Sequence, residues 1–284
     1  MRTIKKVHDA EFTPIAGLIT YSPLPSHTLT QIDPFLFLNH HGHQVYPSNN
    51  TGLPFGPHPH RGMETVTFIL EGDIMHKDSS GNQSVITAGG VQWMTAGKGL
   101  IHAEVSSAHF KKEGGALEIL QLWLNLPAKL KMAEPFYKGL QSDEIPRVTL
   151  DNGKVILNLI SGNWEGVEGA FNSQTSVSLS TIYFEPGSAI NLEIPEAHNV
   201  FFYVIKGQLD VNDNAAKARQ LVEFNEGGTG LTIKSTEASV LLLGHAEPLN
   251  EPVVAQGPFV MNTYEEIEEA YEDYRNGKFG TWQF

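Results

Sequence analysis

The hydrophobic positions of this chain come in short runs separated by turn residues, the pattern of a β-rich protein. The first half contains six such runs, which we predict to be strands over residues 64–70, 73–78, 84–87, 91–94, 103–105 and 117–126. The turns between them carry glycine, asparagine or serine, and little room is left for helix. Regular short strands with turns of this kind indicate an antiparallel barrel or sandwich.

The second half repeats this pattern in outline. Its predicted strands are residues 155–160, 178–184, 200–205, 208–211, 220–224, 231–233 and 240–243. Each half also has a strand pair that turns at a glycine, Gly72 in one and Gly207 in the other. Prolines at Pro135 and Pro146 interrupt residues 128–150, which we interpret as a connector. A chain of 284 residues accommodates two domains, and we expect them at residues 1–135 and 136–284.

One clear helix is predicted at the end of the chain. Thr263 with Glu266 three residues on forms a capping-box sequence. Apolar side chains then follow at helical spacing at Ile267, Ala270, Tyr271 and Tyr274, and Gly277 ends the segment. The predicted fold class is therefore all-β, with two similar domains and a C-terminal helix.

Two histidine-containing pairs stand out in the first half. His58 and His60 are two residues apart, and so are His102 and Glu104. Side chains at positions i and i+2 of a strand leave from the same face, so each pair can converge on one point. Three neutral imidazoles and one carboxylate would hold a divalent metal and leave coordination positions for water or substrate.

The second half has no matching histidines. His58 and His60 lie 14 and 12 residues before Gly72, and the same offsets from Gly207 give Glu193 and Pro195. Proline has no side-chain ligand atom, and no histidine lies in residues 228–233. We therefore predict one metal ion per chain, held by the first half.

A third group of histidines lies at His40, His41 and His43, around Gly42. We place this stretch in a loop. It could form a second metal cluster or a lid, but exposed loop histidines commonly have no special role.

Charge and composition exclude several classes of protein. The net charge is −13, with 12 basic and 13 acidic residues up to residue 150 and 7 basic and 19 acidic residues after it. An acidic surface repels phosphate backbones, so we expect no direct nucleic-acid binding. The chain has no cysteine, which excludes disulfides and thiolate zinc sites. No segment has the length of a membrane span and the start lacks the apolar core of a signal peptide, so we expect a cytoplasmic protein.

Several long strings of this sequence resemble one family. They are DPFL from residue 33, HPHRGMETVTFILEG from residue 58, VQWMTAGKGLIHAE from residue 91, LQLWLNLPAKLKM from residue 120 and EPVVAQGPFVMNTYEEI from residue 251. These strings are similar to the pirins, which belong to the bicupin branch of the cupin superfamily. The resemblance implies two tandem cupin domains, each a jelly-roll β-barrel, of which the C-terminal one is vestigial. It also implies that His58, His60, His102 and Glu104 are the ligands of a metal, usually iron.

Glu64 is a further candidate for a role at the metal. A glutamate of the first motif is a metal ligand in the general cupin pattern, but here the spacing to Gly72 places Thr65 at that position. Glu64 could hold a histidine ring or act as a base near the open face of the metal. The alternative is a strand residue paired with a buried donor.

The resemblance implies a metal-dependent quercetin (flavonol) 2,4-dioxygenase, with a flavonol-like aromatic substrate and dioxygen as partners. Glu104 or Glu64 would accept the proton of the flavonol hydroxyl. The ligand set suits iron and also nickel, manganese, copper, cobalt and zinc. An alternative of another class is a metal- or redox-sensing regulator that binds a partner enzyme or transcription factor, with the acidic second half as a docking surface. We expect a monomer.

Overall fold

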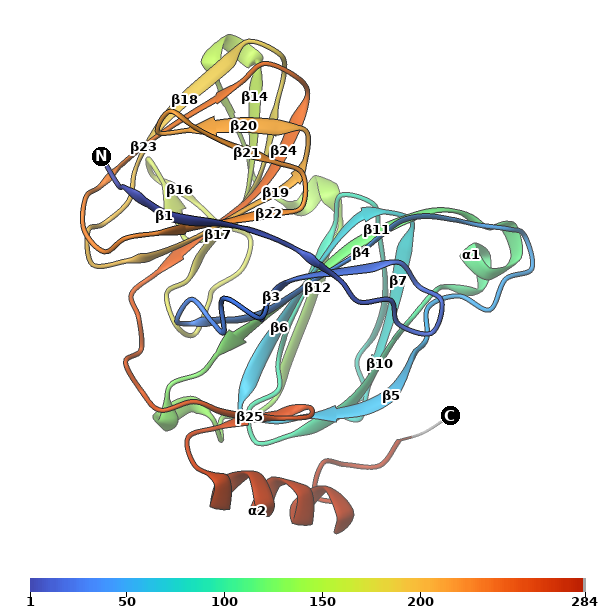
Figure 1. The fold of residues 1–284 in the computed structure, drawn as a ribbon. Helices are drawn as coiled ribbons and strands as arrows, with labels where there is room; N and C mark the ends of the chain where they lie inside the picture. The colour runs from blue at the N-terminus through green and yellow to red at the C-terminus, as the bar shows by residue number, and fades with distance from the viewer. Residues whose placement is uncertain (283–284) are drawn as a thin grey trace. The chain divides into compact units, whose positions relative to one another are not determined.

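The computed structural model describes residues 1–282 and consists mainly of strands (Figure 1). The strands form two compact units, which we name the first barrel and the second barrel. The first barrel comprises residues 12–21, 36–142 and 249–282, and the second comprises residues 1–11, 22–35 and 143–248. The predicted all-β class with two similar domains and a C-terminal helix is confirmed.

The first barrel is made of two sheets. The larger sheet has the order β12 (Phe136–Leu140), β9 (Val91–Thr95), β6 (Met63–Glu71), β11 (Gly115–Asn125), β4 (Phe35–Tyr46), β3 (Thr20–Leu24) and β2 (Glu11–Phe12). The smaller sheet has the order β5 (Phe55–His60), β10 (Leu100–Val105), β7 (Asp73–Asp78) and β8 (Gln83–Thr87). Side chains such as Ile69, Ile74 and Leu117 form an apolar core in this barrel.

The second barrel repeats this arrangement. Its larger sheet has the order β1 (Ile4–Asp9), β22 (Gln220–Phe224), β19 (Asn199–Lys206), β24 (Ser239–Ala246), β17 (Ser178–Phe184), β14 (Val155–Ser161) and β13 (Arg147–Leu150). Its smaller sheet has the order β18 (Ser188–Glu193), β23 (Gly230–Ser235), β20 (Gln208–Val211) and β21 (Asn214–Lys217). The hairpin of β15 (Asn163–Trp164) and β16 (Val167–Glu168) follows β14.

Glycine makes the equivalent turn in both barrels. Gly72 joins β6 to β7 with φ of 83°, and Gly207 joins β19 to β20 with φ of 75°. A side chain at either position would collide with the neighbouring strand, because an added Cβ would lie 2.9 Å from the carbonyl oxygen of Ala116 or 2.5 Å from that of Ala238. These turns therefore require glycine, which is why they mark the repeat in the sequence.

Short helical segments connect the strands. They are α1 (Ala108–Glu113), η1 (Ala128–Leu130), η2 (Ser142–Glu144) and η3 (Asp151–Gly153). Helix α1 was not predicted. It is only one and a half turns long, so it has no amphipathic period to detect, and its local signal is the Ser107 hydroxyl that caps the amide of Phe110.

The terminal helix α2 (Tyr264–Arg275) has the predicted capping box between Thr263 and Glu266. It follows the hairpin of β25 (Val254–Gln256) and β26 (Phe259–Met261), beside which it lies in Figure 1. Of the predicted stripe, Ile267 and Ala270 are buried and Tyr271 is half-buried, whereas Tyr274 is exposed. The apolar stripe of α2 packs on the hairpin, so helix and hairpin form one structural element.

The two units differ from the two continuous domains expected from the sequence. The terminal segment, expected with the second domain, belongs to the first barrel. Arg61 in the first barrel makes a buried ion pair of 2.8 Å with Asp273 of α2 and a bridge to Phe259 of β26. The first strand, β1, conversely pairs with β22 of the second barrel. No local sequence signal indicates that the terminal segment belongs to the first barrel or that β1 belongs to the second.

Among residues 1–282, no helix is long and apolar enough to cross a membrane.

Candidate metal centre

Strands β5 and β10 bring three histidines together in the first barrel. The two strands pair antiparallel, with His102 opposite His58 and Leu100 opposite His60. The ring centroids of the three histidines are 4.4 to 5.0 Å apart, and one nitrogen from each ring lies within 4.8 Å of the others. His60 and His102 are buried, while His58 is partly accessible. The predicted convergence of these three side chains is therefore present.

Hydrogen bonds at Nδ1 leave the Nε2 atoms of His58 and His60 available as ligand atoms. Nδ1 of His58 lies 2.7 Å from the carbonyl oxygen of Gly56, and Nδ1 of His60 lies 3.1 Å from that of Pro258. Each Nδ1 therefore carries the proton, and each Nε2 has a free lone pair. Nε2 of His58 lies 3.0 Å from Nε2 of His102, and Nε2 of His60 is buried without a hydrogen-bond partner in the described chain. Lone pairs that converge in this way fit a divalent cation.

Burial keeps the imidazoles of His60 and His102 neutral. It lowers the pKa of His60 to about 3, with a smaller contribution from the nearby His58. Burial also lowers the pKa of His102 well below its usual value, and the neighbouring histidines lower it further. A metal binds the neutral form of imidazole, so these rings need not lose a proton at neutral pH before they ligate.

Glu104, the fourth predicted ligand, lies outside this group of three. It is buried two residues after His102 on β10, and its carboxylate is held by three donors. The Thr67 hydroxyl donates to Oε1 at 2.8 Å, the Gln92 amide donates to the same oxygen, and the Gln121 amide donates to Oε2 at 2.5 Å. Coordination by Glu104 therefore stays a prediction.

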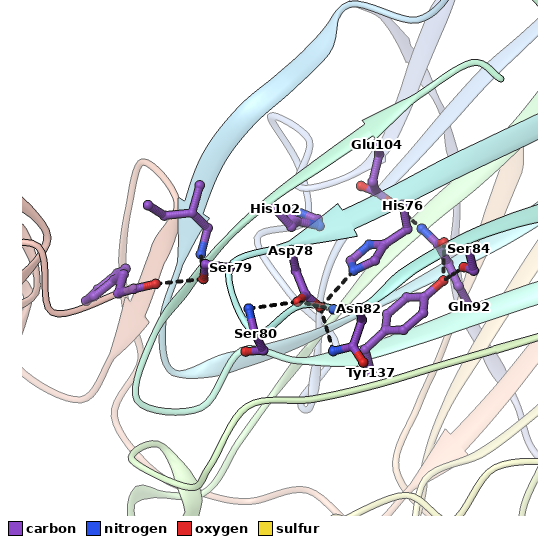
Figure 2. A network of polar contacts seen from close by, with 12 residues as sticks. His76, Asp78, Ser79, Ser80, Asn82, Ser84, Gln92, His102, Glu104 and Tyr137 are labelled. Atoms are coloured by element: carbon purple, nitrogen blue, oxygen red, sulfur yellow. Dashed lines mark hydrogen bonds and ion pairs between the residues drawn. The ribbon is translucent and has the colours of Figure 1, made fainter. Parts of the chain in front are cut away.

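The side-chain amides of Gln92 and Gln121, which hold Glu104, are themselves oriented by hydrogen bonds. Figure 2 shows Gln92 with Tyr137 and Glu104. The Tyr137 hydroxyl donates to Oε1 of Gln92 at 3.0 Å, which turns the Gln92 nitrogen toward Glu104. The indole N–H of Trp123 donates to Oε1 of Gln121 at 3.2 Å, with the same effect. The orientation of the carboxylate is thus determined by residues from four strands, β6, β9, β11 and β12.

His76 is part of the same network, and no sequence motif marks it. It is buried opposite Glu104 on β7, with Nε2 3.0 Å from Oδ2 of Asp78. Its ring stacks on Tyr137 with centroids 3.8 Å apart and lies 5.4 Å from the ring of His102 (Figure 2). Asp78 also accepts from the backbone amides of residues 80 and 82, so His76 is rigidly held.

The structure does not place Glu64 at the metal centre, contrary to one of its predicted roles. Glu64 is three residues from Thr67 on β6, and side chains at odd separations leave opposite faces of a strand. Its Oε1 accepts a 2.6 Å hydrogen bond from the Thr95 hydroxyl, which is the alternative of a strand residue paired with a buried donor. Burial raises the pKa of Glu64 to about 7.

His40, His41 and His43 lie within β4 and not in a loop, so that expectation was wrong. Nε2 of His40 is 2.8 Å from Glu118, and Nδ1 of His41 is 2.8 Å from the Thr20 hydroxyl. Both rings are buried, and none of the three histidines belongs to the metal-binding group. The glycine at position 42 suggested a turn, but the strand continues through it.

The second barrel can be aligned with the first through the turn glycines and the strand pairs. The fourth residue after Gly72 pairs with Glu104, and the fourth residue after Gly207 pairs with Ile233. Along the same strand pairs, Leu192, Ile194, Leu231 and Ile233 occupy the positions of His58, His60, His102 and Glu104. The offsets counted from sequence gave Glu193 and Pro195, one residue away, because the connection before β19 contains one more residue.

The donors around Glu104 are replaced in the same way. In the first barrel Thr67 pairs with both Gln92 and Gln121. In the second barrel the equivalent pairs join Phe202 to Val222 and Leu243. Every polar position of the site is therefore apolar in the second barrel, and the described residues contain one histidine group that could hold a metal.

This fold and this site define a bicupin protein, with two cupin barrels and a histidine cluster suited to a divalent metal in the first. Comparison with known families agrees: the pirin model matches residues 17–124, and the model of the pirin C-terminal cupin domain matches residues 179–280. The chain belongs to the pirin family.

Its relatives extend over nearly the whole chain. Pirin-1 of Arabidopsis thaliana is 40% identical over 255 residues, which are 88% of this chain and 84% of the relative. A Pseudomonas aeruginosa protein provisionally named a quercetin 2,3-dioxygenase is 36% identical over 94% of this chain and 92% of its own. The crystal structure of quercetin 2,3-dioxygenase from Acinetobacter baumannii superposes with a TM-score of 0.92, at 34% identity over 99% of both chains.

Proposed function

We propose that this protein is a metal-dependent flavonol dioxygenase of the quercetin 2,4-dioxygenase type. The observation that carries the proposal is the convergence of the His58, His60 and His102 rings in the first barrel, with one nitrogen of each ring within 4.8 Å of the others. The likeness to proteins named quercetin dioxygenases over almost the full chain supports the same reaction.

His58, His60 and His102 would hold the metal through Nε2, with Glu104 as the proposed fourth ligand. We propose iron, and nickel, manganese, copper, cobalt and zinc suit the same donors. A bound divalent ion supplies positive charge that favours the deprotonated form of the flavonol 3-hydroxyl.

Glu104 would receive the proton of that hydroxyl. Oε1 accepts hydrogen bonds from Thr67 and Gln92, whereas Oε2 accepts one from Gln121. Oε2 therefore has more lone-pair capacity left, and we assign the proton to this atom. The two oriented amides keep the carboxylate in place while its charge changes.

An aromatic wall beside the histidines would orient the substrate. The rings of Phe37 and Trp123 stack with centroids 4.6 Å apart, and Trp123 lies 5.2 Å from the ring of His60. A flat flavonol gains apolar contact with such a wall. In the overall reaction one dioxygen molecule adds to the flavonol, the central ring opens to an ester, and one carbon is released as carbon monoxide.

The test is to reconstitute the purified protein without oxygen with ferrous, manganese, nickel or cupric ion, and then to measure carbon monoxide release from quercetin in air. At least one metal form should turn over quercetin, and His58→Ala should abolish turnover. A matched control is His27→Ala, because His27 is exposed and pairs only with Glu11. Turnover that survives His58→Ala would refute this function.

The alternative is a regulator without catalytic activity. It would be favoured if no metal form released carbon monoxide and a protein partner bound the metal-loaded chain but not the metal-free chain.

A further inference from the structure

The second barrel contains a cavity of about 210 Å³. It lies among β14, β17, β18 and β24, and the β15–β16 hairpin contributes Trp164. Its apolar walls are formed by Leu157, Leu159, Leu192, Ile194, Leu243 and Trp164. An apolar barrel could have filled this space with larger side chains, so the cavity needs an explanation.

The alignment of the two barrels shows what this cavity corresponds to. Leu192 and Ile194 occupy the positions of the ligands His58 and His60. Leu243 occupies the position of Gln121, and His245, two residues further along β24, occupies that of Trp123. The cavity therefore corresponds to the part of the first barrel around His58 and His60, with these two proposed ligands replaced by apolar side chains.

The polar residues of the lining are Asn163, Trp164, Ser178, Ser180, Glu193 and His245, and none of them is a lysine or arginine that could pair with an anion. The indole Nε1 of Trp164 is buried and has no hydrogen-bond partner in the described chain. The Nδ1 atoms of His245 and His198 are 2.9 Å apart. Burial lowers the pKa of His245 to about 4, so His245 is neutral at physiological pH. Glu193 is the charged residue of the lining, and its side chain is exposed because it alternates with the buried Leu192 along β18.

We propose that this cavity is a second, metal-free binding site for a small uncharged molecule with one aromatic ring and one hydrogen-bond acceptor. The acceptor would take the Trp164 N–H, because leaving a buried donor unpaired is unfavourable. The size is suitable: an engineered apolar cavity of about 150 Å³ in another protein binds benzene. A charged ligand would lose its hydration without gaining an ion pair.

Acetophenone is a suitable probe, because it combines one ring with one carbonyl acceptor. We would titrate it into the full metal-loaded chain by calorimetry and by ligand-observed NMR. We expect saturable binding at one site per chain. Ethylbenzene has the same shape without an acceptor and should bind more weakly, and the anion benzoate should not bind.

Two variants locate the site. Trp164→Phe keeps a ring but removes the donor, and should weaken acetophenone binding about fivefold while leaving ethylbenzene binding unchanged. Leu159→Phe fills the cavity and should abolish binding of both, with circular dichroism to show that it is folded. Trp123→Phe is the matched control in the first barrel and should have no effect.

The proposal would be overturned if acetophenone did not saturate, if folded Leu159→Phe bound it as well as the parent chain, or if His58→Ala removed the binding. The last outcome would place the probe at the metal centre. Because the readout is binding of a molecule that is not a flavonol, failure of this proposal is distinct from failure of the proposed dioxygenase activity.

Discussion

The two barrels share their strand order and pairing but fill their interiors in opposite ways. Seven interior positions of the first barrel carry His58, His60, His102, Glu104, Thr67, Gln92 and Gln121, and the equivalent positions of the second barrel carry apolar residues. The same backbone therefore supports either a polar site or a packed core. Which one forms depends on the side chains at a few interior strand positions.

This difference implies that the two barrels are stabilised differently. Each apolar side chain buried in the second barrel contributes about 1.5–3 kcal/mol. The polar residues of the first barrel contribute less and must satisfy one another, as the donors around Glu104 do. We infer that the second barrel contributes more to stability. The first barrel buries fewer apolar side chains, because polar residues occupy the interior positions that form its site.

The largest effect is expected when a ligand is replaced by its counterpart in the second barrel. His60→Ile removes one of three imidazoles at the place where the second barrel has Ile194. Carbon monoxide release from quercetin should fall more than about 100-fold, since even changes beyond the ligands reduce metal sites by about 10- to 100-fold. Activity within about tenfold of the parent chain would mean that His60 is not a ligand.

The next largest effect is expected in the core of the second barrel. Phe202→Ala should lower the free energy of unfolding by about 3–5 kcal/mol, because it opens a cavity among fully buried side chains. The equivalent change in the first barrel, Thr67→Ala, removes one of three donors to Glu104 and should cost about 1 kcal/mol. Urea unfolding followed by circular dichroism measures both. Equal losses would contradict the difference between the barrels.

A pH dependence is expected from Glu64, which is buried in the first barrel with its pKa raised from 4.5 to about 7. The folded state binds this proton more tightly than the unfolded state, so the stabilising contribution of Glu64 is fully present below pH 4.5 and is lost as the pH rises through 7. The full loss is about 3 kcal/mol. Glu64→Gln should remove this slope, as judged by urea midpoints between pH 5 and about 8. An unchanged slope would show that another group titrates.

The smallest effect is expected from the residue that orients Gln92. Tyr137→Phe removes the hydroxyl that donates to Oε1 of Gln92, so the amide can turn away from Glu104. The loss of about 1 kcal/mol should lower kcat about fivefold with little change in KM, because the flavonol does not contact Tyr137 in our proposal. A rise in KM at constant kcat would indicate a role in substrate binding instead.

The sequence predicted the features that depend on local chemistry. The turn at Gly72, the capping box at Thr263 and the i, i+2 spacing of His58 and His60 each follow from a few neighbouring residues. These local signals were enough to identify thirteen of the strands, the terminal helix and the three histidines.

The features that the sequence missed depend on distant contacts. The face on which Glu64 lies depends on where β6 starts relative to the barrel interior. The strand through Gly42 is held by its neighbours in the sheet, and the packing of α2 on the first barrel depends on the Arg61–Asp273 ion pair, which joins residues 212 positions apart. Gln92 and Tyr137 have no motif, and only the contacts of Gln92 with Glu104 and of Tyr137 with Gln92 reveal them.

Metal content per chain tests the difference between the barrels most directly. After reconstitution and gel filtration, elemental analysis of the parent chain should give close to one metal ion per chain, and His102→Leu, which copies Leu231 of the second barrel, should give close to none. Retention of the ion by a folded His102→Leu chain, or two ions per parent chain, would contradict the assignment of a single metal site to the first barrel.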